Sequence, residues 1–366
     1  MDPQTLHRDA LVVDGHTDVP TRLFGSPADL SQRLTDGHVD LPRLREGGVT
    51  APVFALFVPP MLSAEDGLEH ARDLYELTRQ QVDHEGFVHA VSVDDVERAK
   101  RRGEVAVLLG LENGRCLILP GALEEMAEIG VRYVTATHVG SHEWCDASTD
   151  DPLHGGLSKK GEEIVWRMSR MGIVPDVSHV SDDAVRHILD VSQTPIVASH
   201  SSARALCDHP RNLPDDLVRE IARNDGVVLA NCYPAFLDDE AAKVNGERVK
   251  KLRPLIEEVT ERGREGFRDF AKKRRKILDE NPLPPVPLSV YVDHVMHLIG
   301  LVGEDRVGIG TDFDGIPETP EGFDDVAAFP RLTEELLKRG VTPGGVRRVL
   351  GENFLRVLRE AERRAV

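Results

Sequence analysis

Near its N-terminus the chain reads Leu11-Val12-Val13-Asp14-Gly15-His16-Thr17-Asp18, an apolar run that leads directly into a His-x-Asp pair. Near the other end it reads Val307-Gly308-Ile309-Gly310-Thr311-Asp312, a second strand-like run that leads to a carboxylate. In a barrel of alternating strands and helices the first and last strands are neighbours, and their C-terminal ends open onto one mouth. The two runs therefore predict that His16, Asp18 and Asp312 meet at such a mouth.

Between these two runs, short apolar segments alternate with charged amphipathic ones. The apolar segments are rich in Val and Ile and bounded by Gly or Pro, which predicts eight strands. They lie near Leu11–Asp14, Val49–Val58, Val105–Leu111, Val131–Thr137, Ile173–Val177, Ile196–Ser199, Val227–Asn231 and Val307–Gly310. Helices are predicted near Ala64–His84, Asp94–Arg102, Leu123–Ile129, Lys160–Met171, Asp182–Leu189 and Leu217–Arg223. Because strands separated by helices pair in parallel, we predict an α/β fold, a (β/α)8 TIM-type barrel formed by one domain over residues 1–366.

A long charged segment, Asp238 to Glu280, follows the seventh predicted strand and ends at the Pro-rich stretch Asn281–Pro287. Its pattern is helical, and it contains the basic run Lys272-Lys273-Arg274-Arg275-Lys276. Since the chain as a whole is acidic, we interpret this run as a solvated face of a helical insertion and not as a nucleic-acid contact.

Composition and charge narrow the classes of function. Of the 366 residues 40% are hydrophobic and 30% charged, as in a soluble globular protein with an ample core. The net charge of -18 argues against nucleic acid or an anionic membrane as a partner, because both are polyanions. We see no apolar leader, no membrane-spanning run and no apolar C-terminal anchor signal. The cysteines lack a Cys-x-x-Cys pair and read as reduced thiols, so a cytoplasmic location is expected; they are Cys116, Cys145, Cys207 and Cys232.

Histidine or carboxylate residues stand at the ends of most predicted strands. Beyond the first and last strands, these residues are Glu112, His138, His179 and His200. Taken singly, a strand-end histidine is an ordinary hydrogen-bonded residue, and Glu112 would suit a helix N-terminus. Gathered at the C-terminal end of one barrel, where catalytic groups are found, they predict an active site.

The chemistry of this set suits a metal centre. Three histidines (His16, His179, His200) and two carboxylates (Asp18, Glu112) are donors that zinc and similar divalent ions prefer. Two positions apart at a strand end, His16 and Asp18 point to the same side and can reach one metal. Five ligands exceed what one tetrahedral catalytic ion uses, whereas two ions that share a carboxylate would use all five. The residues alone therefore predict a binuclear metallohydrolase.

The ordered motifs resemble the renal (membrane) dipeptidase family, within the amidohydrolase-like metal-dependent barrels. The matching segments are Asp14-Gly15-His16-Thr17-Asp18-Val19-Pro20, Gly110-Leu111-Glu112-Asn113-Gly114, Val131-Arg132-Tyr133 through Thr137-His138, Asp176-Val177-Ser178-His179-Val180-Ser181, Ser199-His200-Ser201-Ser202-Ala203-Arg204, His209-Pro210-Arg211-Asn212-Leu213-Pro214-Asp215, Gly308 through Gly315, and Gly351-Glu352-Asn353. They extend over nearly the whole chain. The resemblance implies that His16 and Asp18 bind one zinc ion, that His179 and His200 bind the other, and that Glu112 bridges both.

The same resemblance implies roles for the substrate-facing residues. His138 would contact the substrate carbonyl and its developing oxyanion, and Arg211 would hold the C-terminal carboxylate, which suits a planar guanidinium. Tyr233 would lie in the substrate site. Asp312 would accept a proton from the bridging water and deliver it to the leaving amine.

The resemblance therefore implies a zinc-dependent dipeptidase with two Zn²⁺ ions per chain, or other divalent ions in their place, that cleaves the peptide bond through a metal-bridging hydroxide. Its bacterial relatives often act on dipeptides with a D-residue at the C-terminal position, so L-Xaa-D-Xaa substrates are included. The expected partner is a small dipeptide, with a homodimer as the assembly considered and neither nucleic acid nor membrane involved. The segment Thr50-Ala51-Pro52-Val53-Phe54-Ala55 departs from the family's usual Gln- and aromatic-bearing version, which leaves side-chain preference open.

Two other classes of function compete with this one. The first is another binuclear barrel hydrolase, such as a lactonase, phosphotriesterase or deaminase, or an enzyme that opens β-lactams or related amides. Arg211 discriminates here, because a carboxylate clamp serves a dipeptide and has no use for a neutral ester. The second is a non-catalytic metal- or peptide-binding protein, since a fold alone does not establish a function. Against it, every ligand and proton-shuttle position of the family is filled.

Overall fold

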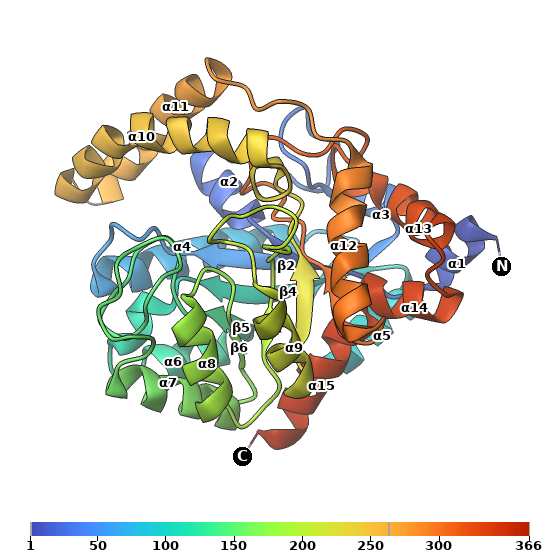
Figure 1. Cartoon of the computed structure of the whole chain (residues 1–366), viewed down its shortest axis with the longest axis horizontal. Coiled ribbons are helices and arrows are strands. Elements are labelled where there is room, and N and C mark those ends of the chain that lie inside the picture. Colours follow the sequence, from blue (N-terminus) through green and yellow to red (C-terminus); the bar gives the residue numbers. More distant parts are fainter. Residues whose placement is uncertain (1, 263, 366) are drawn as a thin grey trace.

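The computed structural model describes residues 2–262 and 264–365, and Figure 1 shows strands surrounded by helices. The strands are β1 (Val12–Thr17), β2 (Val49–Phe57), β3 (Phe87–His89), β4 (Val105–Glu112), β5 (Val131–Thr135), β6 (Val174–Asp176), β7 (Val197–Ala198), β8 (Val227–Ala230) and β9 (Val307–Ile309). They pair in parallel in the order β1-β2-β4-β5-β6-β7-β8-β9, and β3 pairs with β4 outside this path.

Backbone contacts between β1 and the segment after β9 bring the two ends of this path together. Thr17 forms a parallel bridge with Phe313. The Asp312 N–H donates to the His16 carbonyl at 3.0 Å, and the Asp18 N–H donates to the Phe313 carbonyl at 2.8 Å. The predicted (β/α)8 TIM-type barrel is thereby confirmed, as a parallel and nearly closed sheet.

Helices cover the outside of the barrel. Between β2 and β9, and apart from the insertion described below, these helices are α4 (Ala64–Val82), α5 (Val93–Arg102), α6 (Ala122–Glu128), α7 (Lys159–Arg170), α8 (Asp182–Val191), α9 (Asp215–Arg223) and α12 (Leu288–Val302). Several begin at a serine whose hydroxyl accepts the backbone N–H three residues further on, namely Ser63, Ser92, Ser158 and Ser181. Such N-caps satisfy an N–H that the helix leaves unpaired and fix where the helix begins.

The remaining helices lie near the two termini. They are α1 (Pro3–Asp9), α2 (Val19–Gly25), α3 (Leu41–Glu46), α13 (Phe329–Lys338), α14 (Pro343–Arg347) and α15 (Asn353–Arg364). Phe354 and Leu358 of α15 share a buried cluster with Val13 of β1 and Leu229 of β8. The C-terminal helix therefore packs directly on the barrel strands.

The strand predictions agree with the structure in place but not in every boundary. β5 ends at Thr135, two residues before its predicted end, and β7 has only two residues. The short strand β3 was not predicted, because it has only three residues and carries no alternating pattern, and only the first of them, Phe87, is buried.

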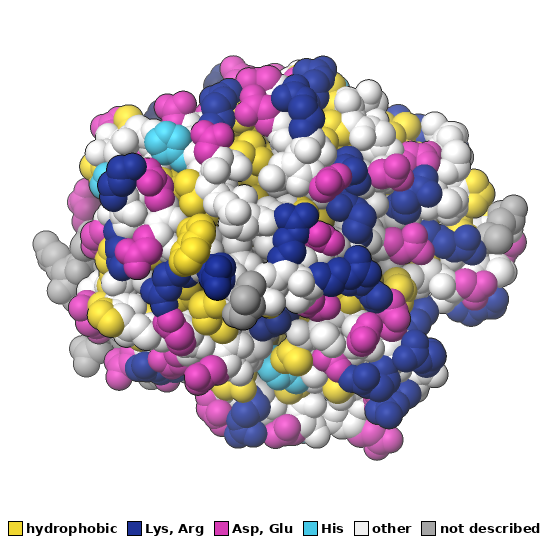
Figure 2. All heavy atoms as spheres, turned by 90° about the horizontal axis from the view of Figure 1, so that it is seen from below, with side chains coloured by type: hydrophobic (Ala, Val, Ile, Leu, Met, Phe, Trp, Pro, Cys, Tyr) yellow, Lys and Arg dark blue, Asp and Glu magenta, His cyan; other side chains and the backbone are white. Residues whose placement is uncertain are grey.

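The predicted insertion is a pair of helices, α10 (Asp239–Arg262) and α11 (Arg264–Asp279), which follow β8, the seventh strand of the path. In Figure 1 this pair lies across the top of the barrel, while α15 lies at the bottom. Seen from below, the described residues present acidic and basic side chains intermingled, with no large patch of one sign (Figure 2). Among the described residues, none of the helices has the length and apolar character that crossing a bilayer requires.

Candidate active site at the mouth of the barrel

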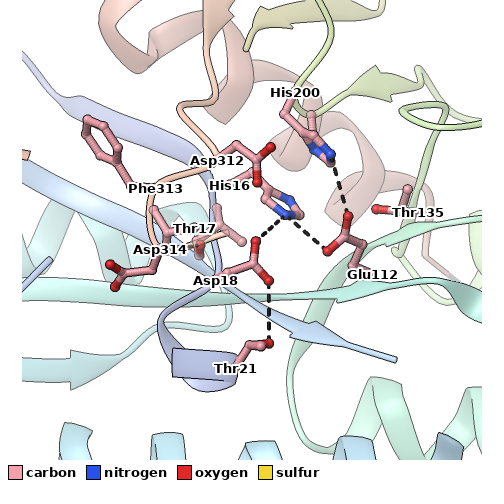
Figure 3. A network of polar contacts seen from close by, with 12 residues as sticks. His16, Thr17, Asp18, Thr21, Glu112, Thr135, His200, Asp312, Phe313 and Asp314 are labelled. Atoms are coloured by element: carbon pink, nitrogen blue, oxygen red, sulfur yellow. Dashed lines mark hydrogen bonds and ion pairs between the residues drawn. The ribbon is translucent and has the colours of Figure 1, made fainter. Parts of the chain in front are cut away.

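The strand register brings the predicted site residues to one level. Glu112, the last residue of β4, pairs with Phe57 of β2 and with Thr135 of β5, and Thr135 pairs in turn with Asp176 of β6. The remaining metal-binding candidates lie at or just beyond the ends of their strands, as Figure 3 shows for β1 and its neighbours. The C-terminal ends of the strands therefore form a ring of polar side chains, here called the mouth.

Glu112 lies at the centre of this ring. Its Oε2 is 3.5 Å from Nε2 of His16, which is also 3.5 Å from Oδ2 of Asp18. Its Oε1 is 3.1 Å from Nε2 of His179 and 3.6 Å from Nε2 of His200. The two carboxylate oxygens thus face two different groups of donors, as Figure 3 shows for His16 and His200.

The donor atoms fit divalent cations. Nε2 of His16 is buried and has no hydrogen-bond partner among the described residues. Nε2 of His179 and Nε2 of His200 face each other at 2.9 Å, and two lone pairs at that distance need a proton or a cation near them. His–Glu–His and His–Asp–Asp groupings, each with ligand atoms within 4.8 Å of one another, recur around the mouth. Imidazole nitrogens and carboxylates together suit zinc and similar ions.

Two buried hydrogen-bond chains orient the imidazoles. Nδ1 of His16 lies 2.7 Å from the hydroxyl of Tyr133, which donates its own proton to the Gly15 carbonyl at 3.0 Å. Because the hydroxyl proton is used there, the Tyr133 oxygen accepts from Nδ1–H of His16. Although burial opposes them, the carboxylates around Nε2 raise the pKa of His16 well above its ordinary value. In the neutral ring that metal ligation requires, Nε2 is the nitrogen left without a proton, and it faces Asp18 and Glu112.

His200 is held in the same way from the other side. Its Nδ1 lies 2.7 Å from Oγ of Ser199, whose hydroxyl donates to the Asp176 carboxylate at 2.6 Å. Asp176 also accepts the backbone N–H groups of Ser178 and Ser199. Sequence reasoning quoted Tyr133, Asp176 and Ser199 within matching segments but gave them no role. The sequence signal that could have indicated such a role is the position of Ser199 directly before the strand-end histidine His200.

Electrostatics keep three histidines neutral. Burial lowers the pKa of both His179 and His200 well below the ordinary value, and nearby charges such as Arg211 add to the effect. Burial, followed by Arg211, lowers the pKa of His138 to about 3. His138 also lies at the centre, with Nε2 3.7 Å from Oε1 of Glu112. Neutral imidazoles are what metal ligation and hydrogen-bond donation to an oxyanion both require.

Asp312 is a buried carboxylate whose pKa lies above its ordinary range. Its backbone is in the left-handed region, with φ 66°, and its Oδ2 accepts from Nδ2 of Asn231 at 3.0 Å. Burial, and next the negative charge of Asp18, raises the pKa of Asp312 to about 8. Gly315 leaves room for this pair, because a Cβ atom there would collide with both carboxylates. A carboxyl group that titrates near neutrality can take up and release a proton during turnover.

Arg211 and Tyr233 lie at the same end of the barrel. Arg211 is 4% exposed, and its guanidinium donates from Nη2 to the His200 carbonyl at 3.2 Å and lies 5.3 Å from the centre of the Phe236 ring. Its buried Nε has no hydrogen-bond partner among the described residues. The Tyr233 hydroxyl donates to Oδ1 of Asn245 in α10 at 2.9 Å. Every residue predicted for the site therefore lies at the mouth.

Comparisons with known proteins point to one family. A family model described as membrane dipeptidase (peptidase family M19) matches residues 2–366. Dipeptidase aclJ of Aspergillus oryzae is 33% identical, over 96% of this chain and 78% of its own. The probable dipeptidase PvdM from Pseudomonas aeruginosa superposes with a TM-score of 0.85 at 28% identity, covering 99% of this chain and 98% of its own. A metallopeptidase from Rhodobacter sphaeroides, liganded with a phosphinate mimic of L-Ala-D-Ala, shares the fold with a TM-score of 0.76 at 24% identity, over 96% of this chain and 100% of its own.

Tyr133→Phe should weaken divalent-cation binding, because it removes the oxygen that accepts from Nδ1–H of His16 while keeping the ring. Loss of such an outer partner typically costs about 10- to 100-fold in metal affinity. Competition with a chromogenic chelator measures this. Tyr291→Phe is the matched control, because among the described residues its buried hydroxyl donates to the Ala230 carbonyl and hydrogen-bonds no metal-binding candidate. Equal affinities for both variants would show that Tyr133 does not set the orientation of His16.

Proposed function

The chain belongs to the membrane dipeptidase family, peptidase family M19, and from this premise we propose that it is a zinc-dependent dipeptidase whose substrates include L-Xaa-D-Xaa dipeptides. Its relatives indicate a hydrolase that acts on dipeptides; the zinc ions and the stereochemistry are part of the proposal. One observation carries it: the histidine and carboxylate donors gathered around Glu112 lie beside a buried arginine with an unpartnered Nε–H.

We assign His16 and Asp18 to one zinc ion, His179 and His200 to a second, and Glu112 to both. The orientation of the Glu112 oxygens toward separate donor groups supports a shared ligand. When bound, such ions would supply Lewis acidity that polarises the scissile carbonyl and lowers the pKa of water, so that hydroxide is available as the nucleophile near neutral pH.

The chain's own residues would bind and orient the substrate. Arg211 is proposed to hold the terminal carboxylate, since its guanidinium is buried, fixed and incompletely hydrogen-bonded. His138 is proposed to donate a hydrogen bond to the carbonyl oxygen as negative charge develops there. Its neutral imidazole, tilted at 60° to the Phe57 ring with the ring centres 4.8 Å apart, supports this role. Tyr233 would line the substrate site under α10.

Asp312 is proposed to move the proton. Its carboxylate would accept a proton from the attacking water and pass it to the nitrogen of the leaving residue. The Asn231 amide fixes one oxygen, which leaves the other to face the reacting groups. The buried guanidinium of Arg211 favours dipeptide hydrolysis over hydrolysis of a neutral lactone or phosphotriester, because those substrates have no anion for it to bind.

The direct test joins metal analysis to a hydrolysis panel. Purified protein should carry about two zinc ions per chain and hydrolyse L-L and L-D dipeptides. Glu112→Ala should lose both ions and all turnover, because one shared ligand is removed. Glu143→Ala, which removes an exposed carboxylate paired with Arg115, should change neither. A fully active enzyme with a single ion would contradict the binuclear assignment.

Arg211→Ala should weaken use of dipeptides with a free terminal carboxylate by about 1.5–3 kcal/mol in kcat/KM, the usual worth of a hydrogen bond to a charged group. The matched substrates are the corresponding dipeptide amides. These should be poor substrates of the parent enzyme and lose little more in the variant. Should acids and amides lose equally, Arg211 has a structural role only.

Asp312→Asn should keep both metal ions and bind dipeptide nearly as the parent does, because the amide preserves shape and one acceptor oxygen. Turnover should fall by roughly 10²- to 10⁴-fold, as expected when a general acid–base group is lost. Steady-state kinetics with metal analysis on the same preparation measures both. Substantial turnover with an unchanged pH profile would mean that the proton travels by another route.

A further inference from the structure

The helix pair α10–α11 is anchored to the loops around the mouth. Arg248 of α10 forms an ion pair with Glu318, in the segment that follows β9, and donates to the Leu278 carbonyl at the end of α11. Asn245 of α10 accepts the hydroxyl proton of Tyr233, which follows β8. Figure 1 shows the pair spanning the top of the barrel. The insertion therefore forms one wall of the candidate active site.

The basic run of α11 has one member unlike its neighbours. Lys273 pairs with Glu258 of α10, Arg275 with Asp279, and Lys276 with Glu280, and all three cations are exposed. Arg274 is only partly exposed and makes no hydrogen bond or ion pair within the part of the chain that the structure describes. The interpretation of this run as a solvated face is therefore wrong for Arg274.

The helical register explains the difference. Arg274 precedes Leu278 by four residues, which places both on one face of α11, and Leu278 is 5% exposed. Because the Leu278 side chain is buried, this face of α11 turns inward and not toward solvent. Lys273 and Arg275, at neighbouring positions, are rotated away from it.

The groups whose charges act on the pKa of Arg274 belong to the mouth and its loops. Burial lowers the pKa of Arg274, while Tyr233, Asp18, Glu318 and Asp312 act in the opposite direction. Of these, Glu318 is already engaged by Arg248. The guanidinium thus lies on the side of Asp18 and Asp312.

Arg211 lies at the same mouth, where Asp312 also acts on its pKa, but it is anchored beyond the end of β7 and not on the insertion. Its guanidinium bonds the His200 carbonyl, and its charge depresses the pKa of His138, His179 and His200. A half-buried cation without a partner is costly to keep, so its retention calls for an anion that arrives from outside. A dipeptide already has its terminal carboxylate assigned to Arg211, and the remaining anion that it can bring is a side-chain carboxylate.

We propose that Arg274 is a specificity-determining residue that binds an acidic side chain of the dipeptide, so that the enzyme prefers substrates with a carboxylate beyond the terminal one. This inference rests on the proposed dipeptidase function. It gives the helical insertion a part in substrate selection. The two arginines then have complementary roles, because Arg211 binds the terminal carboxylate of the dipeptide and Arg274 binds a side-chain carboxylate.

Matched acid and amide substrates test the inference. The pairs are Ala-Glu with Ala-Gln and Glu-Ala with Gln-Ala, each with the second residue in L and D form. The parent enzyme should favour the acid in at least one pair by about 10-fold or more in kcat/KM. Arg274→Gln should lower kcat/KM for that acid by on the order of 10- to 100-fold and leave its amide within about threefold. Arg274→Lys should keep part of the preference, because charge remains while the planar fork is lost.

Arg275→Gln is the control, since Arg275 lies on the same helix, is exposed, and pairs only with Asp279 among the described residues. It should leave every ratio unchanged. Equal losses on acid and amide in Arg274→Gln would overturn the inference, as would a parent enzyme that hydrolyses neutral dipeptides without preferring any acid. A parent enzyme that hydrolyses no dipeptide would instead overturn the proposed function, and this inference with it.

Discussion

The site depends first on the junction between the first and last strands. The Asp14 carboxylate of β1 accepts the backbone N–H of Thr311 at 2.9 Å and its hydroxyl at 2.6 Å, beyond the end of β9. Asp14 is fully buried, so these two bonds satisfy a group that would otherwise be costly to bury. They fix the register of the two strands, and that register decides whether Asp312 lies beside His16. Gly310 tightens the same region, because a Cβ there would collide with the Ser199 carbonyl on β7's end.

Backbone strain marks the same strand ends. Asn113, His179 and Asp312 adopt left-handed φ values of 68°, 71° and 66°. Each is a non-glycine residue directly after a strand or within a few residues of its end, and such conformations cost on the order of 1 kcal/mol or more. A sharp reversal at a strand end turns a side chain inward that a continuing strand would carry past the mouth. The stability of the barrel around them holds these residues in place, which is why strain of this kind gathers at functional sites.

The sequence predicted what depends on strand direction and missed what depends on long-range packing. His16, Glu112 and Asp312 could be grouped because parallel strands place their C-terminal ends at one edge, whatever the loops do. Tyr133 could not be matched to His16, because the hydroxyl and the imidazole meet only through the packing of β5 beside β4 and across the barrel. Arg274 was misjudged for a related reason: net charge describes the whole surface and says nothing about which helix face meets the barrel.

The charges at the mouth explain why the insertion belongs to the site. Asp18, Glu112 and Asp312 carry up to three negative charges into a buried space, and divalent cations at their oxygens would compensate them. The arginines add positive charge, and Glu318, the carboxylate near Arg274 that has no proposed part in the chemistry, is already held by Arg248. A zwitterionic dipeptide brings one anion for its one cation, which leaves a guanidinium unmatched. A substrate with a second carboxylate would supply an anion for that guanidinium. Because α11 supplies one of the two guanidinium groups, sequence changes in the insertion can alter substrate preference while the strand ends retain the proposed catalytic groups.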